Sequence, residues 1–186
     1  MIDNALSDVR VLLVEDNAYM RRILLTIMRA LGFPAPLVAE DGVIGLQLFE
    51  QHAPDLVMVD WEMPNLNGAE VVRAIRKPER GTAAFTPIVM ITGYSDKGRV
   101  LEAARLGVNE VITKPVSIQA LAARVSSALF EERNFILTNR YFGPAPRKAL
   151  FDLGDPQELP EVLQEALNDA PRQITNKDET DTFVID

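Results

Sequence analysis

The sequence contains no cysteine, so disulfide bonds, thiolate metal sites and cysteine nucleophiles are all excluded. It contains a single histidine, His52, which cannot by itself form a metal site made of several histidines. No apolar run reaches the roughly 18 residues that a transmembrane helix needs, and the N-terminus has neither the basic region nor the apolar core of a signal peptide. We therefore expect a cytoplasmic protein with no membrane partner.

Positive charge is scarce towards the C-terminal end. The 186 residues carry a net charge of −8, and residues 143–186 hold ten acidic and four basic residues, a net of −6. An acidic segment repels nucleic acid, so we expect no nucleic-acid partner. The remaining composition, 47% hydrophobic and 25% charged, is typical of a globular domain. A chain of this length forms one domain, or one domain with an appendage.

Five short apolar runs alternate with segments of helical periodicity. Strands that are apolar throughout, without alternation, are typical of a parallel sheet covered on both faces by helices. Right-handed crossovers leave few arrangements of such strands. We therefore predict an α/β fold with a doubly wound, five-stranded parallel sheet of flavodoxin-like strand order 2-1-3-4-5. The five predicted strands cover residues 10–14, 36–39, 56–59, 88–91 and 110–113.

The alternation of strands and helices stops near residue 132. We therefore predict a folded domain over residues 8–132, followed by an acidic, proline-containing C-terminal extension over residues 133–186. Within the extension, residues 159–170 carry a single apolar stripe that favours a short helix. A helix of this length is marginally stable alone, so it either packs on a surface or stays largely unfolded.

Polar side chains follow four of the predicted strands. Glu15 and Asp16 follow the first strand, Asp60 the third, Thr92 the fourth and Lys114 the fifth. Taken singly, these residues have ordinary interpretations as helix caps, turn formers or solvated charges. The carboxyl ends of parallel strands, however, meet at one edge of a sheet, so we expect these side chains to lie close together. Three neighbouring carboxylates repel one another, and magnesium, which prefers carboxylate and water oxygens, would relieve the repulsion.

This set of groups is suited to the transfer of a phosphoryl group onto a carboxylate. The transferring group spreads negative charge over its oxygens, and a metal ion, an ammonium group and a hydroxyl would stabilise that charge. Asp60 is the predicted nucleophile and would form an acyl phosphate. Lys114 would supply the ammonium group and Thr92 the hydroxyl.

From about Val9 to Leu129 the chain resembles the receiver domain of response regulators in bacterial two-component signalling, in particular stand-alone receivers of the chemotaxis type. The resemblance is carried by Val14-Glu15-Asp16-Asn17, Asp60-Trp61-Glu62-Met63-Pro64, Thr92-Gly93 and Lys114-Pro115. A fainter similarity, over residues 135–137 and 140–144, links the extension to a segment that follows some stand-alone receivers. This similarity suggests that the extension belongs to the receiver and is not a separate output domain.

The resemblance implies a role for each acidic residue of the site. Asp60 would receive a phosphoryl group from a sensor histidine kinase or a histidine phosphotransfer protein. Asp16, Asp60 and the backbone carbonyl of Glu62 would hold Mg2+, and Glu15 would act on the metal, often through water. The protein would then be a signalling phosphoacceptor, not an enzyme with a separate substrate, and it would signal to a downstream protein partner.

The resemblance also implies contacts of Thr92 and Lys114 with the phosphoryl group, and Lys114–Pro115 is the candidate for a cis peptide bond. Receivers commonly carry Tyr or Phe three residues before this lysine. Here that position is Val111, which excludes an aromatic switch at this place. Trp61, the only tryptophan, directly follows the predicted phosphoacceptor, so we expect its fluorescence to report on occupation of the site.

Other functions are weighed against this interpretation. The protein could serve as a phosphate shuttle or sink in a phosphorelay, or as a constitutive pseudo-receiver interaction module; the complete set of site residues argues against the second. A DNA-binding regulator is opposed by the acidic extension, in which the sequence shows no pair of helices with a basic recognition face. A metal-dependent phosphohydrolase would need a further acid–base carboxylate placed after Asp60, which the sequence does not show. A homodimer is compatible with each interpretation.

Overall fold

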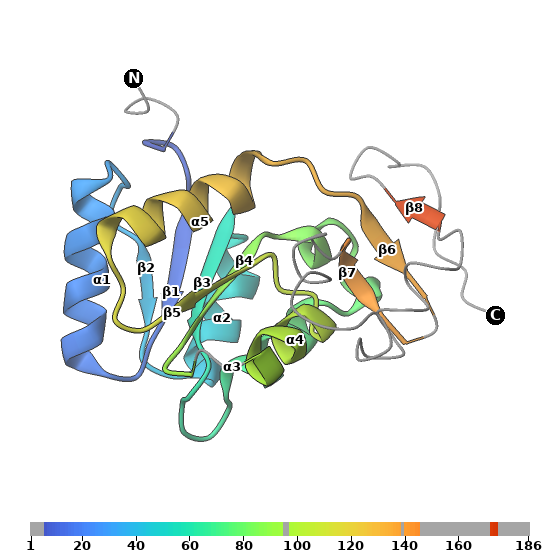
Figure 1. Ribbon diagram of the computed structural model, residues 1–186, viewed down its shortest axis with the longest axis horizontal. Helices are drawn as coiled ribbons and strands as arrows, with labels where there is room; N and C mark the ends of the chain where they lie inside the picture. The colour runs from blue at the N-terminus through green and yellow to red at the C-terminus, as the bar shows by residue number, and fades with distance from the viewer. Residues whose placement is uncertain (1–5, 95–96, 139, 146–171, 175–186) are drawn as a thin grey trace.

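The computed structural model describes residues 6–94, 97–138, 140–145 and 172–174 (Figure 1). Its main body is a parallel sheet in the order β2-β1-β3-β4-β5, which confirms the predicted α/β, flavodoxin-like fold. The five strands are β1 (Val11–Val14), β2 (Leu37–Ala39), β3 (Leu56–Asp60), β4 (Ile88–Thr92) and β5 (Glu110–Thr113).

Helices cover both faces of this sheet, and each face has its own apolar core. Helices α1 (Ala18–Ala30) and α5 (Ile118–Phe130) pack on one face, while α2 (Gly42–His52), α3 (Gly68–Ile75) and α4 (Lys97–Arg105) pack on the other. Along β1, Leu12 and Val14 point into one core and Val11 and Leu13 into the other. Burial on both faces explains why the strands lack the alternation of a half-exposed sheet.

Side-chain caps begin four of the helices and thereby fix the loops that carry the site. Asn17 caps α1 by accepting hydrogen bonds from the backbone N–H groups of residues 19 and 20. Asp41 caps α2, Asn67 forms a capping box at α3, and Ser117 caps α5. Because Asn17 caps α1, the carboxylate of Asp16 is not engaged as the cap of this helix.

A second, smaller sheet lies beyond the main body, and the sequence did not predict it. Strands β6 (Phe135–Leu137), β7 (Phe142–Pro144) and β8 (Arg172–Ile174) pair antiparallel in the order β7-β6-β8. A short 3-10 segment, η1 (Pro78–Phe85), was also not predicted. The predicted helix over 159–170 lies outside the described residues, and the predicted boundary at residue 132 stays a prediction.

Aromatic rings join the extension to the main body. The ring centroid of Phe85 lies 4.7 Å from that of Phe135 and 5.3 Å from that of Phe142. The hydroxyl of Tyr141, which is buried, donates to the backbone oxygen of Pro144 at 2.7 Å, and burial raises the pKa of Tyr141 to about 12. Residues 135–138 and 140–144 are therefore packed against the sheet body and not detached from it.

A buried arginine supports the same junction. Arg76 is 5% exposed and donates hydrogen bonds to the backbone oxygens of Gly107, Ala84 and Thr86 and to the side chain of Asn109, at 2.7 to 2.9 Å. Its guanidinium also lies 5.3 Å from the ring centroid of Phe135. Burial lowers the pKa of Arg76 to about 9.

In the described part of the chain, no helix combines the length and the apolar character that crossing a membrane requires.

Candidate functional site

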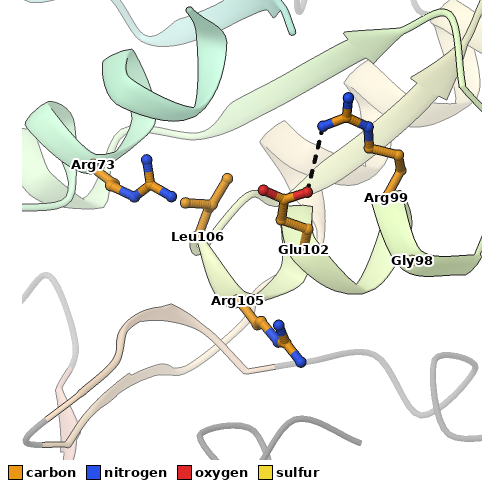
Figure 2. Close-up of a pocket in the computed structure, with 6 residues that line it drawn as sticks. All are labelled: Arg73, Gly98, Arg99, Glu102, Arg105 and Leu106. Carbon is orange, nitrogen blue, oxygen red and sulfur yellow. Dashed lines mark hydrogen bonds and ion pairs between the residues drawn. The ribbon is translucent and has the colours of Figure 1, made fainter.

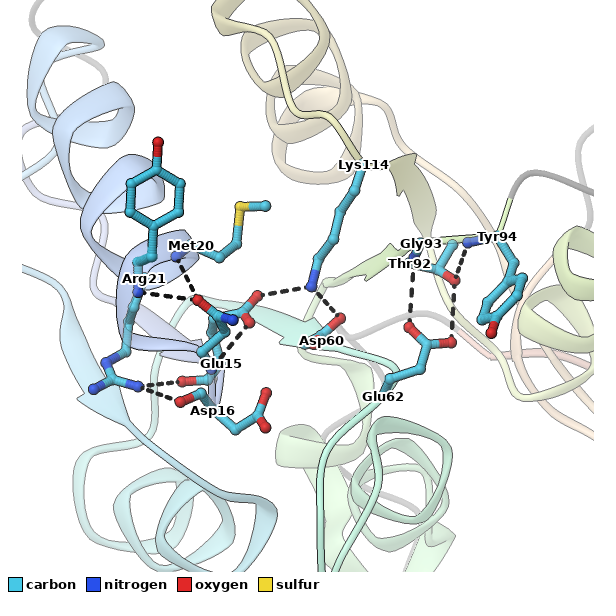
Figure 3. Close-up of polar contacts among 12 residues, drawn as sticks. Glu15, Asp16, Met20, Arg21, Asp60, Glu62, Thr92, Gly93, Tyr94 and Lys114 are labelled. Atoms are coloured by element: carbon cyan, nitrogen blue, oxygen red, sulfur yellow. Dashed lines mark hydrogen bonds and ion pairs between the residues drawn. The ribbon is translucent and has the colours of Figure 1, made fainter.

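The carboxyl edge of the main sheet brings the predicted site residues together, as Figure 3 shows. Glu15 and Asp16 lie in the loop after β1, Asp60 is the last residue of β3, and Thr92 is the last residue of β4. Lys114 directly follows β5 and extends back across this edge. Four separate strand ends therefore contribute to one site.

Three carboxylates form the acidic part of the site. Glu15, Asp16 and Asp60 each place a carboxylate oxygen within 4.8 Å of the other two. Glu15 is fully buried and Asp60 is 2% exposed, whereas Asp16 is open to solvent. Two buried charges of the same sign at this separation repel strongly, because little water screens them.

Lys114 supplies the positive charge that faces them. Its Nζ lies 2.9 Å from Oδ1 of Asp60 and 3.2 Å from Oε2 of Glu15. Among the described residues neither of these two oxygens accepts a hydrogen bond of regular geometry, and the ammonium group is the compensating charge. One lysine offsets part of the negative charge of two buried carboxylates and leaves a net negative site.

The pKa values of the site reflect this imbalance. Burial and the charge of Asp60 raise the pKa of Glu15 to about 7, although Lys114 acts in the opposite direction. Burial likewise raises the pKa of Asp60 against the effect of Lys114, and the charges of Glu62 and Asp16 add to the rise. Burial alone would lower the pKa of Lys114, but its hydrogen bonds and its attraction to Asp60 and Glu15 outweigh burial and raise it.

The donor set fits a hard divalent cation. Carboxylate oxygens are the ligands that Mg2+ prefers, and two of the three here are buried on a rigid sheet edge. Oε2 of Glu15 and Oδ1 of Asp60 accept no regular hydrogen bond within the described residues, and a cation bound there would share these oxygens with the nearby ammonium group of Lys114. The predicted fourth ligand, the backbone carbonyl of Glu62, lies two residues after Asp60 in the adjoining loop.

Glu62 makes contacts that the sequence did not reveal. Its carboxylate accepts hydrogen bonds from the hydroxyl of Thr92 at 3.5 Å and from the backbone N–H of Gly93 at 3.4 Å. It also forms an ion pair with Arg99 of α4, at 3.7 Å. The side chain of Glu62 therefore lies over the end of β4 and engages the hydroxyl that we assigned to the phosphoryl group (Figure 3).

Trp61, the predicted fluorescence reporter, is buried although it lies in the loop after β3. Its side chain is 5% exposed and belongs to the core under α2 and α3. The guanidinium of Arg99 lies 4.6 Å from the centroid of the Trp61 ring and 5.3 Å from that of Tyr94, which is 55% exposed. Arg99 therefore links the ring of Trp61 to the carboxylate of Glu62.

Two further residues position the site without contributing a reacting group. The guanidinium of Arg21 donates to the backbone oxygens of Glu15 and Asp16, at 2.8 and 2.9 Å, and so holds the loop after β1. Gly68 lies so close to β3 that a Cβ atom there would come 2.2 Å from the backbone oxygen of Asp60. For Gly68 the sequence offered one signal, the turn-forming Asn67-Gly68 pair, and for Arg21 it offered none.

The neighbourhood of Lys114 completes the site. The Lys114–Pro115 peptide bond is cis, and the Lys114 backbone N–H donates to the backbone oxygen of Thr92 at 2.8 Å. Val111 pairs with Met90 in the sheet and is partly buried against the core on the α2–α4 face. No aromatic ring at position 111 can therefore follow a movement of Thr92.

Comparison with known proteins agrees with this geometry. The family model of the response regulator receiver domain matches residues 11–126. Chemotaxis protein CheY of Pseudomonas aeruginosa is 34% identical over 125 residues, which make up 67% of this chain and 98% of that protein. Chemotaxis protein CheY1 of Helicobacter pylori is 35% identical over 121 residues, 64% of this chain and 96% of that protein. Among solved structures, Vibrio cholerae chemotaxis protein CheY4 matches with a TM-score of 0.60 and 26% identity, over 65% of this chain and 98% of that one.

Proposed function

The chain belongs to the response regulator receiver family, and on this premise we propose that Asp60 accepts a phosphoryl group from a phosphohistidine. The donor would be a sensor histidine kinase or a histidine phosphotransfer protein. One observation supports the proposal above all: the Asp60 carboxylate is buried at the sheet edge, 2.9 Å from Lys114 and within 4.8 Å of Glu15 and Asp16.

The reaction moves one phosphoryl group between two nucleophiles. A carboxylate oxygen of Asp60 forms a bond to phosphorus while the bond from phosphorus to the imidazole nitrogen of the donor breaks, and the imidazole retains the electron pair. Burial raises the pKa of Asp60, so the positive charges of Lys114 and of a bound cation would be needed to keep its carboxylate in the deprotonated form that attacks phosphorus. Lys114 keeps the Asp60 carboxylate in place and offers a positive charge to the transferred oxygens.

Glu15, Asp16, Asp60 and the carbonyl of Glu62 would hold Mg2+, which when bound supplies positive charge for the phosphoryl oxygens. Without a cation, a phosphoryl group with its negative charge would approach three carboxylates that are offset by a single lysine. The donor set thus requires a further cation for the reaction that we propose.

Thr92 gives the site two states. In the structure its hydroxyl donates to Glu62 and accepts from the backbone N–H of Tyr94, at 3.1 Å. A phosphoryl group on Asp60 would offer a stronger acceptor, and the hydroxyl would exchange Glu62 for it. Exchange of that partner would free Glu62 and, through Arg99, alter the surface of α4. We propose that this surface passes the signal to a partner protein.

We further propose that the protein turns over no separate substrate and catalyses only its own phosphorylation and the loss of that phosphate. Use as a phosphate shuttle or sink would rely on the same site and would differ in a second transfer, from Asp60 back to a histidine. Mixing the phosphorylated chain with an unphosphorylated histidine phosphotransfer protein separates these possibilities, because return of phosphate to histidine identifies a shuttle.

The test of the proposed function is phosphorylation by a small-molecule donor such as acetyl phosphate, with Mg2+. We expect one acid-labile phosphoryl group per chain by intact mass spectrometry, and none in Asp60→Asn. Asp55→Asn is the matched control, because Asp55 is a partly exposed carboxylate of the same strand region, paired with Arg10 and remote from the sheet edge. Labelling of Asp60→Asn as strong as that of the wild type would refute the proposal.

The acidic extension gives a second test, directed at the kind of output. The net charge of −6 over residues 143–186 supports output through protein contacts and opposes contact with nucleic acid. Removal of all residues after Arg147, which includes β8, should leave phosphorylation intact and change partner binding or self-association. Tight, salt-sensitive binding of duplex DNA by the full chain would contradict this part of the proposal.

A further inference from the structure

A pocket of about 510 Å³ lies between α3 and α4 (Figure 2). Its size falls in the range of small-molecule sites, roughly 300 to 1,000 Å³. Helix α3 contributes one residue to its lining, and α4 with the residue that follows it contributes the others. The lining residues are Arg73, Gly98, Arg99, Glu102, Arg105 and Leu106.

The lining is positively charged although the protein as a whole carries −8. Three of its six residues are arginines, and Glu102, its single carboxylate, is paired with Arg99 at 3.4 Å. Arg73 and Arg105 are exposed, and within the described residues neither forms an ion pair. The C-terminal end of a helix favours a cation, and both Arg73 and Arg105 lie in the last turn of their helices, but this effect does not explain why the two arginines line one pocket.

We propose that this pocket binds a small polyanion that carries phosphate or carboxylate groups. The planar fork of a guanidinium matches two oxygens of either group, and Arg73 and Arg105 reach the pocket from two different helices. Leu106 offers an apolar surface between them, as Figure 2 shows, for the carbon skeleton of such a ligand. The proposal concerns a site distinct from the phosphoacceptor and does not rest on the proposed function.

Arg99 connects this pocket to the phosphoacceptor site. It lines the pocket and pairs there with Glu102, and it also forms an ion pair with Glu62 at 3.7 Å and lies 4.6 Å from the Trp61 ring centroid. An anion between α3 and α4 would attract Arg99 and weaken its pairing with Glu62. Because coupling between two binding sites is reciprocal, a change at Glu62 would in turn change affinity for the anion.

The experiment uses pyrophosphate as the probe and the full chain in resin-treated, metal-free buffer at constant ionic strength. Without a metal, the carboxylate site repels the probe, so a saturable heat in calorimetry reports on other sites. We expect saturable binding, accompanied by a change in the fluorescence of Trp61. The double variant Arg73→Ala/Arg105→Ala should bind at least about tenfold more weakly, because it loses two charge-assisted contacts.

The matched control is Arg22→Ala/Arg29→Ala, which removes two exposed arginines from α1 on the opposite face of the sheet. This variant should bind pyrophosphate like the wild type. Citrate should compete for the same site, and the tighter of the two probes identifies the ligand as phosphate-bearing or carboxylate-bearing. Unchanged affinity in the Arg73/Arg105 variant, equal losses in both variants, or the absence of saturable binding would overturn the site.

Two further outcomes bear on the ligand class and on the coupling. Binding of a hexaglutamate peptide without binding of pyrophosphate would overturn a small-molecule ligand in favour of an acidic protein segment. A saturable heat of pyrophosphate binding without any change in Trp61 fluorescence would overturn the connection through Arg99. A fluorescence change that is lost in Arg99→Gln while the chain stays folded by circular dichroism would support it.

Discussion

The hydroxyl of Thr92 donates to the carboxylate of Glu62 at 3.5 Å, so the hydroxyl that we propose for the phosphoryl group is already engaged by a negatively charged side chain. The same carboxylate raises the pKa of Asp60, which shows that its charge is felt at the reacting group. Glu62 is held there by Gly93 and Arg99 and not by Thr92 alone. Under the proposed function, a phosphoryl group on Asp60 would have to displace Glu62 from the hydroxyl of Thr92.

We expect Glu62→Gln to accelerate phosphorylation by a small-molecule donor about three- to tenfold, because one charge that repels the phosphoryl group is removed near a partly exposed site. The backbone carbonyl of residue 62 is unchanged, so its proposed role at the metal is preserved. Rates follow from intact mass spectrometry at several times after mixing. Glu102→Gln is the control: it also removes a partner of Arg99 but lies on α4, and its rate should equal that of the wild type.

Glu15 makes stability depend on pH when no metal is present. Its pKa rises from 4.5 to about 7 in the folded protein, so the unfolded chain releases this proton at a lower pH than the folded chain does. Between these values the folded state binds more protons, and the free energy of unfolding therefore falls as pH rises. The raised pKa of Asp60 acts in the same direction above its ordinary value.

Urea denaturation at a series of pH values checks this. In Glu15→Gln, the free energy of unfolding should fall much less between pH 4.5 and about 7 than it does in the wild type. Glu79→Gln, an exposed control, should show the same fall as the wild type. An unchanged slope in Glu15→Gln would show that the burial of this carboxyl does not govern its protonation. In the same window Mg2+ should bind more tightly as pH rises, because a metal ligand has to be deprotonated.

The fluorescence of Trp61 should change when Mg2+ is added and again when beryllofluoride, a mimic of the phosphoryl group, is added. The ring is buried and in contact with Arg99, whose partner Glu62 has to move when Thr92 turns. Lys114→Ala should abolish the second change, because the mimic loses its ammonium partner. Val111→Ala should retain it, since residue 111 has no aromatic ring to move. Equal loss in both variants would contradict this description of the switch.

Arg76→Met should reduce the free energy of unfolding by about 3 kcal/mol or more, because several buried acceptors lose their donor at once. The four acceptors are three backbone oxygens and the Asn109 side chain. Arg73→Met, on the exposed side of the same helix, should change stability by no more than about 0.5 kcal/mol. Similar urea midpoints for the two variants would show that the guanidinium of Arg76 can be replaced by packing alone.

The sequence predicted the fold and the site because both depend on local patterns. Apolar runs such as Leu56–Val59 report burial on both faces of a sheet, and the polar residues that follow them are placed at one edge by topology alone. The same argument could not predict the contact between Glu62 and Arg99. Their contact depends on where α4 lies relative to the loop after β3, and no sequence spacing encodes that position.

The small sheet was missed for a related reason. Its strands have three residues each, and β6 pairs with β8 across more than thirty intervening residues. Runs this short are below the length at which periodicity identifies a strand, and the alternation with helices that marked the equally short β2 stops near residue 132. Trp61 illustrates another limit: its place directly after β3 in the sequence does not reveal that its ring is buried in the core that the sheet shares with α2 and α3.

The contacts of Phe85 with Phe135 and Phe142 determine where this receiver domain can be joined to another protein. Phe135 and Phe142 pack on Phe85 from beyond the last helix, and Gly107 passes so near the backbone that a Cβ there would come 2.8 Å from the oxygen of Phe142. A hybrid protein joined directly behind α5 would expose the ring of Phe85 and strip the aromatic cover from Arg76. The transplantable unit is therefore longer than the five-stranded body, and a fusion junction belongs after residue 145.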